Sequence, residues 1–353
     1  MSVIRSGNFG EPGAAPTEPP ASRSVTGGGA EALTAASRKA RAENTWIVTD
    51  GSVGMEAQGI AVAEAVGLPF SLKRARIKGA MRVVPARFQI YVSPAALFRS
   101  VQSNEPLQPP WPRLVISIGP RGAPTALAIK RASGAFGLHI GHPKVPAQLF
   151  DLVAAPVHDN VEGNNVVTTF GAVHSVTKAR LAEAAKRFAP RAEPLPHPRI
   201  AILLGSAAFS FPPEIAATLG TELAALVRGA GGSLLATPPR RTRADSLAAL
   251  SAAIKGVPHN VWDGSGDNPY FAFLATEDSV NMITEAAGTG KPVYIQALKG
   301  RSRQLARFHA LMQERGATRP FEGRLETWTY APINDTELVA SAIRRALHLE
   351  TKA

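Results

Sequence analysis

The feature that most constrains this chain is a unit of strand, glycine-containing turn and helix that recurs along its length. The apolar run WIVT leads to Asp50 and a turn with two glycines, after which GIAVAEAVGL carries apolar residues at helical spacing. The run LVISIG and the segment PRGAPTALAIKRAS repeat this pattern further on. Strands that alternate with helices in this way predict an α/β protein with parallel, doubly wound sheets.

A proline-rich segment separates two sets of these units. Four prolines stand among residues 190–199, where they oppose the hydrogen bonding of helices and sheets. After them the pattern restarts at IAILLGS, and 353 residues suffice for two domains of roughly 100 to 200 residues each. We therefore expect two Rossmann-like domains that face a cleft, with ligands at the carboxyl ends of both sheets.

Composition sets the expected boundaries. Residues 1–44 are rich in Gly, Pro, Ala and Ser and lack a periodic apolar face, which predicts a disordered tail. The first Rossmann-like domain is expected at 45–189, the linker at 190–199, the second domain at 200–334, and a C-terminal helix within 335–353.

Several classes of protein do not fit this composition. No run approaches the 18 or so apolar residues of a membrane span, and the first ten residues lack the apolar core of a secretory signal, so we expect a cytoplasmic protein. The absence of cysteine excludes disulfides, thiolate metal sites and cysteine nucleophiles. No metal-ligand spacing such as HExxH occurs, and no metal site is predicted.

A formal charge of +12 favours anionic partners. In residues 73–87, six basic residues interleave with apolar ones without an acid among them. Such a stretch can lie on an anionic membrane surface, which would place the protein peripherally on the inner membrane, or it can be an ordinary basic surface. Nucleic acid is the less expected partner, because this stretch contains no aromatic residue on which bases could stack.

Loops that follow predicted strands are candidate anion sites in the first half. Gly51, Ser52 and Gly54 allow backbone N–H groups to approach an anion closely, although a tight turn alone would also explain them. Arg121, after the run LVISIG, could pair with phosphate or carboxylate, or remain solvated.

Two loops of the second half are similar candidates. Gly205 and Ser206 follow a strand and could cradle a diphosphate at a helix N-terminus. Arg240 and Arg241 follow the next strand and add two cations, which a solvated face would also explain.

The most specific segment begins at Glu277. Asp278 and Ser279 can cap a helix whose first N–H groups point at a phosphate, and Glu285, about two turns further on, can reach a ribose diol. The simpler alternative is an ordinary cap followed by an exposed glutamate.

Together these segments resemble the mitochondrial fission family of ELM type, named for "elongate mitochondria" and itself similar to GT-B glycosyltransferases. The resemblance covers nearly everything after residue 45, and its segments include TDGSVGMEAQGIAVAEAVG, SIGPRGAPTALAIKR, ATPPRRTR and TEDSVNMITEAAGTGKPVYI. The last segment is similar to the nucleotide-sugar site of the lipid-linked N-acetylglucosamine transferase of peptidoglycan synthesis. That resemblance implies that Ser279 contacts phosphate, that Glu285 holds the ribose, and that the loop Gly51–Gly54 lies on the acceptor side.

The activity implied is the transfer of a sugar from a nucleoside diphosphate to an unknown, lipid-linked or other acceptor, without a tightly bound cofactor. Arg240, Arg241 and Ser279 would stabilise the leaving diphosphate in place of a metal ion. Asp50 and His158 are weak candidates for the base, since a lone histidine is more often structural. The alternative is a non-catalytic binding or recruitment protein at a membrane surface that keeps the fold without the chemistry.

One departure from the family pattern concerns the second sheet. The chain passes from NPYFAFLA directly to TEDS, where the family pattern leads us to expect a further helix end and an apolar strand. If that strand is missing, the second sheet loses a central element, and the placement of residues Glu277 to Ser279 becomes uncertain.

Overall fold

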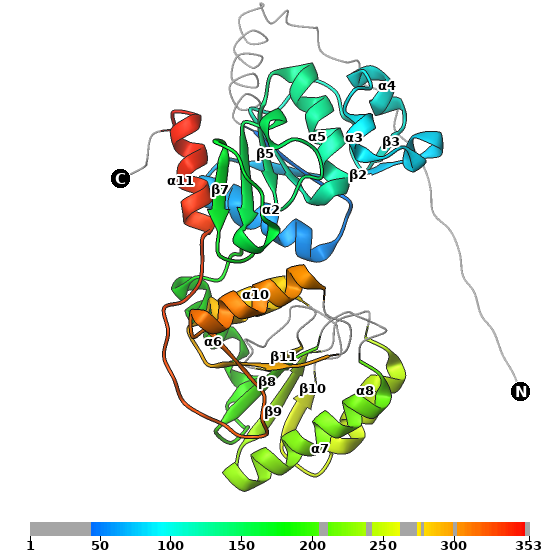
Figure 1. Ribbon diagram of the computed structural model, residues 1–353. Coiled ribbons are helices and arrows are strands. Elements are labelled where there is room, and N and C mark those ends of the chain that lie inside the picture. The colour runs from blue at the N-terminus through cyan, green and yellow to red at the C-terminus, as the bar shows by residue number, and fades with distance from the viewer. Residues whose placement is uncertain are drawn as a thin grey trace, which may run out of the picture. The chain divides into compact units, whose positions relative to one another are not determined.

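The computed structural model describes residues 44–204, 211–237, 242–261, 274–276, 279–298 and 302–349. These residues form two mainly parallel sheets, each with helices on both faces (Figure 1). Of the tail expected at residues 1–44, only Asn44 belongs to the described part of the chain.

The first sheet is built around two strands that are buried along their whole length. Every residue of β1 and β4 is buried, and helices cover both faces, so these strands are mainly apolar and have no exposed polar face. Trp46 and Val48 pack toward α5, whereas Ile47 packs toward α2 and α11. The strand order is β3-β2-β1-β4-β5-β6-β7, parallel except for the β2–β3 edge pair. The strands are β1 (Thr45–Thr49), β2 (Phe70–Ile77), β3 (Val101–Ser103), β4 (Leu114–Ile118), β5 (Phe136–Ile140), β6 (Leu152–Pro156) and β7 (Val166–Thr169).

Helices follow the strands of this half as the alternation predicts. α2 comes directly after β1, and α5 directly after β4. The helical segments are α2 (Val53–Val66), α3 (Ala86–Gln89), α4 (Pro94–Arg99), α5 (Gly119–Ser133) and the short 3-10 turns η1 (Gly79–Val83), η2 (Ala147–Leu149) and η3 (Val157–Asp159).

The second sheet has the order β10-β9-β8-β11-β12-β13 among the described residues, with parallel pairing throughout. Helices α7 and α8 pack on one face, and α9 and α10 on the other. The strands are β8 (Arg199–Leu203), β9 (Ser233–Thr237), β10 (His259–Val261), β11 (Leu274–Thr276), β12 (Val293–Gln296) and β13 (Thr318–Pro320). The helices are α7 (Pro213–Ala230), α8 (Ala244–Ile254), α9 (Val280–Ala287) and α10 (Arg303–Glu314).

The apolar strand that the family pattern leads us to expect before the segment at Glu277 is present. Residues Leu274–Thr276 form β11, which pairs with both β8 and β12 in the middle of the sheet. Three residues are enough for this position because neighbours on both sides supply the ladder hydrogen bonds. The second sheet therefore keeps its central element, and α9 follows it as the family resemblance implies.

The proline-rich segment starts later than its composition suggests. α6 (Lys178–Ala192) continues through Pro190, although this proline was expected to end a helix. Pro190 lies in the last turn, where its missing N–H group costs only one of the final helical hydrogen bonds. The non-helical connection to β8 is therefore limited to residues 193–198.

The last helix, α11 (Thr336–Ala346), packs against α2 of the first half (Figure 1). Its buried residues Val339, Ala340 and Ile343 join the same apolar cluster as Val62 and Val66 of α2. The chain thus completes the first half with residues from its other end.

Candidate functional site

The loop after β1 is held in shape by its own polar groups. Gly51 has a φ of 89°, which residues with a side chain rarely adopt. The Asp50 carboxylate accepts hydrogen bonds from the N–H of Ser52 at 3.1 Å and from its hydroxyl at 2.6 Å. Among the residues that the structure describes, none accepts a hydrogen bond from the N–H groups of Val53 and Gly54 at the start of α2. These two N–H groups are therefore free to meet an anion.

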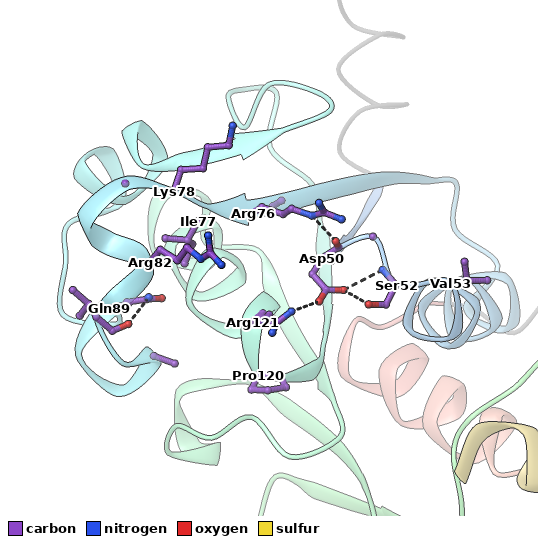
Figure 2. A pocket seen from close by; sticks show the side chains of 15 residues that line it. Asp50, Ser52, Val53, Arg76, Ile77, Lys78, Arg82, Gln89, Pro120 and Arg121 are labelled. Atoms are coloured by element: carbon purple, nitrogen blue, oxygen red, sulfur yellow. Dashed lines mark hydrogen bonds and ion pairs between the residues drawn. The ribbon is translucent and has the colours of Figure 1, made fainter. Parts of the chain in front are cut away.

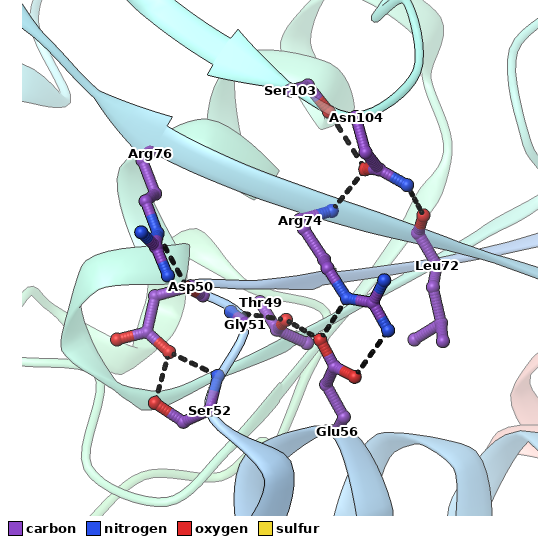
Figure 3. A network of polar contacts seen from close by, with 10 residues as sticks. All are labelled: Thr49, Asp50, Gly51, Ser52, Glu56, Leu72, Arg74, Arg76, Ser103 and Asn104. Atoms are coloured by element: carbon purple, nitrogen blue, oxygen red, sulfur yellow. Dashed lines mark hydrogen bonds and ion pairs between the residues drawn. The ribbon is translucent and has the colours of Figure 1, made fainter.

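A network of polar contacts ties this loop to β2 (Figure 3). Arg74 donates to both carboxylate oxygens of Glu56, from Nε at 2.6 Å and from Nη2 at 2.9 Å. The hydrogen bonds from Arg74 are the main reason why the pKa of Glu56 lies below its ordinary value. The Thr49 hydroxyl donates to the same carboxylate at 3.3 Å, and Nε of Arg76 donates to the Asp50 carbonyl at 2.9 Å.

A cavity of about 1030 Å³ opens beside the loop, at the carboxyl ends of β1, β2 and β4 (Figure 2). Its charged lining consists of Arg76, Lys78, Arg82 and Arg121 against the carboxylate of Asp50. Nη1 of Arg121 lies 3.3 Å from Oδ2 of Asp50. Of the acceptor-side residues expected from the sequence, Gly51, Ser52 and Arg121 line this cavity, and Gly54 follows one residue after the lining residue Val53. The other lining residues are Ala75, Ile77, Gly79, Val84, Ala86, Gln89 and Pro120.

Two side chains fix the wall of the cavity formed by residues 79–92. Gln89 is only 5% exposed, and its Nε2 donates to two carbonyls of the preceding turn at 3.0 and 2.8 Å. Arg131 of α5 donates to the carbonyls of Ile90 and Val92 at 2.7 and 2.8 Å. The wall is therefore anchored to the core of the first half.

The structure divides the basic residues of 73–87 into two groups. Lys73 is buried, pairs with Glu105 and lies 4.5 Å from the ring centre of Trp46. The guanidinium of Arg74 forms an ion pair with the carboxylate of Glu56. Burial withdraws Lys73 from a membrane surface, whereas the side chain of Arg74 is paired but stays 52% exposed. A membrane role stays a prediction for the remaining cations of this stretch.

The two candidate bases differ in where they lie. Burial opposes ionisation of Asp50, but the hydrogen bonds from Ser52 and the nearby Arg121 outweigh it and hold the pKa of Asp50 below its ordinary value. His158 is 3% exposed, does not line the cavity, and packs with its ring 5.1 Å from that of Phe308. Burial lowers the pKa of His158 as well. A general base works best with a pKa near the operating pH and a position beside the substrate; Asp50 lacks the first, and His158 lies away from the cavity.

The start of α9 lies against the start of α2. Asn281 donates to the Gly54 carbonyl at 3.4 Å and accepts a hydrogen bond from Gln58 at 3.2 Å. A Cβ added to Gly54 would stand 2.9 Å from Nδ2 of Asn281, so a larger residue there would displace the Asn281 amide. Ser279 is the N-cap of α9, and its hydroxyl accepts from the Met282 N–H at 3.4 Å. The fold thus brings one residue of the expected donor segment next to the expected acceptor loop.

Glu285 is the unusual acid of this helix. Its carboxylate has no hydrogen bond or ion pair to any residue in the described ranges, and burial raises its pKa to about 7. Other expected donor-side residues lie outside those ranges: Gly205, Ser206, Arg240, Arg241, Glu277 and Asp278. The roles assigned to Ser279 and Glu285 stay predictions.

Sequence patterns did not single out all the residues that the fold gathers here. Arg76 and Lys78, which the sequence assigned only to a basic surface stretch, lie near and just after the end of β2 on the same sheet edge as Asp50, a signal that could have placed them in a site. Gln89 and Asn281 carry no comparable signal, because their places depend on contacts with segments brought together only by folding.

Two further points about the described part of the chain concern clusters of metal-ligating side chains and helices that could span a membrane. No group of three or more His, Asp or Glu side chains gathers there in a way that could hold a metal ion. None of its helices is both long enough and apolar enough to cross a membrane.

Comparison with known proteins establishes the family. The model of the family described as mitochondrial fission ELM1 matches residues 53–347. The chain belongs to the mitochondrial fission ELM1 family. Within this family, the mitochondrial fission protein ELM1 of Arabidopsis thaliana is 30% identical over 274 residues, which cover 67% of this chain and 64% of the plant protein. The match therefore spans less than two thirds of that relative.

Solved structures similar to this ELM1-family chain confirm the fold class. The UDP-GlcNAc 2-epimerase from Methanocaldococcus jannaschii has a TM-score of 0.52 at 12% identity, covering 86% of this chain and 99% of the epimerase. A structure of the same enzyme in complex with UDP-GlcNAc and UDP has a TM-score of 0.51 at 11% identity, with 86% and 99% coverage. At such identities the likeness concerns the fold alone, which is of the GT-B type with two Rossmann-like sheets, as the sequence predicts.

Proposed function

We propose that this ELM1-family chain is a nucleotide-sugar-dependent glycosyltransferase whose acceptor binds in the cavity beside Asp50. The observation that carries the proposal is the contact between Asn281 at the start of α9 and Gly54 at the start of α2. A transferase has to bring donor and acceptor together, and this contact joins the segment expected to bind the donor to the loop that borders the cavity.

Each half would contribute separate groups to the reaction. The N-terminus of α9 at Ser279 would face the diphosphate, and Glu285 would hold the ribose through its otherwise unpartnered carboxylate. Arg240 and Arg241 would stabilise the negative charge that develops on the leaving diphosphate. The proposal includes no tightly bound cofactor or metal ion. The solved complex of the related fold with UDP-GlcNAc and UDP supports the class of donor.

A second candidate is a binding or recruitment protein of the same fold without catalysis, positioned at the cytoplasmic face of a membrane. A specific observation favours it: the pKa of Asp50 is held low, and His158 is buried away from the cavity. A chain that lacks a suitable base could bind a nucleotide sugar without transferring the sugar.

Calorimetric titration of the full chain with UDP and UDP-GlcNAc tests the donor site. We expect binding that weakens about tenfold or more in Ser279→Ala and Glu285→Gln, since each removes one polar contact to a charged or buried partner. Ser302→Ala is the matched control, because Ser302 caps α10 by the same kind of bond and has no proposed donor role. If the intact chain binds neither ligand, the donor proposal is wrong.

Turnover separates the two candidate functions. Release of UDP from UDP-GlcNAc, measured with and without added acceptors, is expected for a transferase. Tight binding that depends on Ser279 and Glu285 without release of UDP under any of these conditions would favour the non-catalytic alternative.

A further inference from the structure

Among the described residues, the cavity-lining cations Arg76, Lys78 and Arg82 lack the acidic partners that the two preceding cations of β2 have. Lys73 and Arg74 are each paired with an acid. The side chains of Lys78 and Arg82 have no hydrogen bond or ion pair with any described residue, and the only such contact of Arg76 is from Nε to a backbone carbonyl. The positive charge at the end of β2 is therefore left without neutralising partners in this part of the structure.

The remaining polar groups around the cavity also suit an anion. Four cations face the single carboxylate of Asp50, which already accepts two hydrogen bonds from Ser52. The start of α2 opens toward the cavity at Val53, and the start of α5 at Pro120. Both helices are long, so their N-terminal dipoles add positive potential at the same place.

The amount of charge distinguishes between classes of anion. Four cations and one carboxylate leave three excess positive charges in the lining, and a ligand with a single carboxylate would neutralise only one of them. A phosphate monoester or a diphosphate carries two or more negative charges and several acceptor oxygens. Arg76, Arg82 and Arg121 come from three different elements, and their planar guanidinium groups can each donate two hydrogen bonds to such a group.

Another polar group points to the remainder of the ligand. Gln89 is nearly buried and lines the cavity, and its Nε2 donates both of the side-chain hydrogen bonds that it forms with described residues. Its Oε1 accepts no hydrogen bond from a described residue and can accept one from a ligand hydroxyl. Ile77, Val84 and Ala86 provide an apolar surface beside it. The cavity volume is at the upper end of the range of about 300 to 1,000 Å³ for small-molecule sites. The cavity therefore has room for a ligand larger than an inorganic ion.

We propose that this cavity is a phosphate subsite, in which Arg76, Arg82 and Arg121 hold the phosphate or diphosphate of a phosphorylated acceptor. The identification of this ligand as the acceptor rests on the proposed function, whereas the anion site itself does not. The site is separate from the donor segment, because none of the residues that line it belongs to the second half of the chain.

The phosphate could be presented by a lipid or by a soluble molecule. Beside the cavity, Val83 is 84% and Tyr91 80% exposed, and Phe88 lies three residues before Tyr91 on the same helical turn, also exposed. Exposed apolar groups next to a phosphate site favour a lipid headgroup, since they can enter the interface of a bilayer. The chemistry of the subsite is the same for both sources.

Titrations of the full chain at constant ionic strength test the subsite. The soluble probes are inorganic pyrophosphate and glycerol phosphate, measured by calorimetry, and the lipid probe is cosedimentation with phosphatidylcholine vesicles that contain or lack phosphatidic acid. We expect Arg82→Gln and Arg76→Gln each to weaken phosphate binding about tenfold, the effect of losing one charge-assisted hydrogen bond. Arg345→Gln, which removes an exposed cation of α11, is the control for the overall charge.

Arg82→Gln is the decisive variant, because its side chain supports no other described residue and its loss cannot act by unfolding the loop. Arginine-dependent binding of the soluble probes supports the subsite with a free phosphate ligand, and arginine-dependent binding of phosphatidic acid vesicles alone supports it with a lipid ligand. The proposal is overturned if no probe binds, if Arg82→Gln binds like the unaltered chain, or if Arg345→Gln weakens binding equally. UDP titrations of the same variants should be unchanged, so that a failure of the donor site and a failure of this subsite give different results.

Discussion

Glu285 has an environment that makes its protonation depend on folding. Burial raises the pKa of its carboxyl from 4.5 to about 7, and no described residue compensates with a hydrogen bond or an opposite charge. The folded chain therefore holds this proton more tightly than the unfolded chain does. The resulting stabilisation is fully present below pH 4.5 and is lost as the pH rises through 7.

The variant Glu285→Gln removes this dependence. We expect its free energy of unfolding to exceed that of the unaltered chain at pH 8 by on the order of 1 to 2 kcal/mol, and to differ little at pH 4. Urea unfolding at the two pH values measures this difference. Glu222→Gln, on the exposed side of α7, should have no such pH-dependent effect. A loss of stability at pH 8 in Glu285→Gln would contradict the assignment of a partly buried acid that has no partner among the described residues.

The basic residues of β2 show how strongly a side chain depends on neighbours that are distant in sequence. Lys73 and Arg76 are three residues apart in a stretch without acids, so in a strand they point to opposite faces of the sheet, but the neighbouring sequence does not give the partners that each face provides. Lys73 meets Glu105 and the ring of Trp46, whereas Arg76 reaches the backbone of Asp50 and the cavity. The sequence predicted a basic surface here and missed that part of it is neutralised inside the sheet.

At the scale of elements, α2 illustrates how close a helix can come to a sheet. A Cβ at Gly59 would stand 2.5 Å from Cγ2 of Ile47 and 2.8 Å from Cδ1 of Ile118. The branched side chain of Ile47 is buried in the core and has little room to move. The absence of a side chain at Gly59 is thus what allows α2 to pack on β1 and β4 and to start beside the cavity.

Gly59→Ala is therefore expected to destabilise the chain by about 1 to 3 kcal/mol, because the added methyl group overpacks the core. Gly229→Ala is the matched control in the last turn of α7, where a Cβ meets nothing within 4 Å. Alanine should stabilise the chain slightly there through its higher helix propensity. Chemical unfolding of both variants measures the two changes, and stabilisation by both would be inconsistent with this packing.

At the scale of the whole molecule, two segments that connect the sheets are hydrogen-bonded to each other, one at His174 and the other at residues 333–336. Nε2 of His174 donates to the Ile333 carbonyl at 2.8 Å, and the Thr336 hydroxyl donates to the His174 carbonyl at 2.8 Å. Burial lowers the pKa of His174, and its Nδ1 accepts a hydrogen bond from the Val176 N–H at 3.2 Å, which requires a neutral imidazole. This histidine has a structural role, and the passage leads α11 back onto α2.

The return of α11 makes the first half depend on the last residues of the chain. Ile343 is fully buried among residues of α2 and the first sheet. Ile343→Ala should lower stability by about 2 to 5 kcal/mol. Hydrogen exchange should locate the loss of protection in α2 and β1 while α7 is unaffected, and Arg345→Ala should change neither. Loss of protection confined to α11 would show that α2 does not depend on this contact.

From its local patterns the sequence predicted the class of fold and several of its strand–helix units, because apolar runs and helical spacing act over a few residues and need no knowledge of distant partners. It placed β1, β4 and α9 correctly, and failed for β11, where three residues give too weak a periodic signal. It also pointed to Gly51, Ser52 and Arg121, which do meet at one cavity.

Which charged side chains find a partner, and which segments of the chain lie side by side, depends on the tertiary structure. Asn281 and Gly54 are 227 residues apart, and Arg74 finds Glu56 across two elements. Such pairs follow from the strand order and from the return of α11, since long-range packing decides the surroundings of each polar group. The free energy of a buried or paired charge depends on those surroundings, which local sequence patterns do not encode.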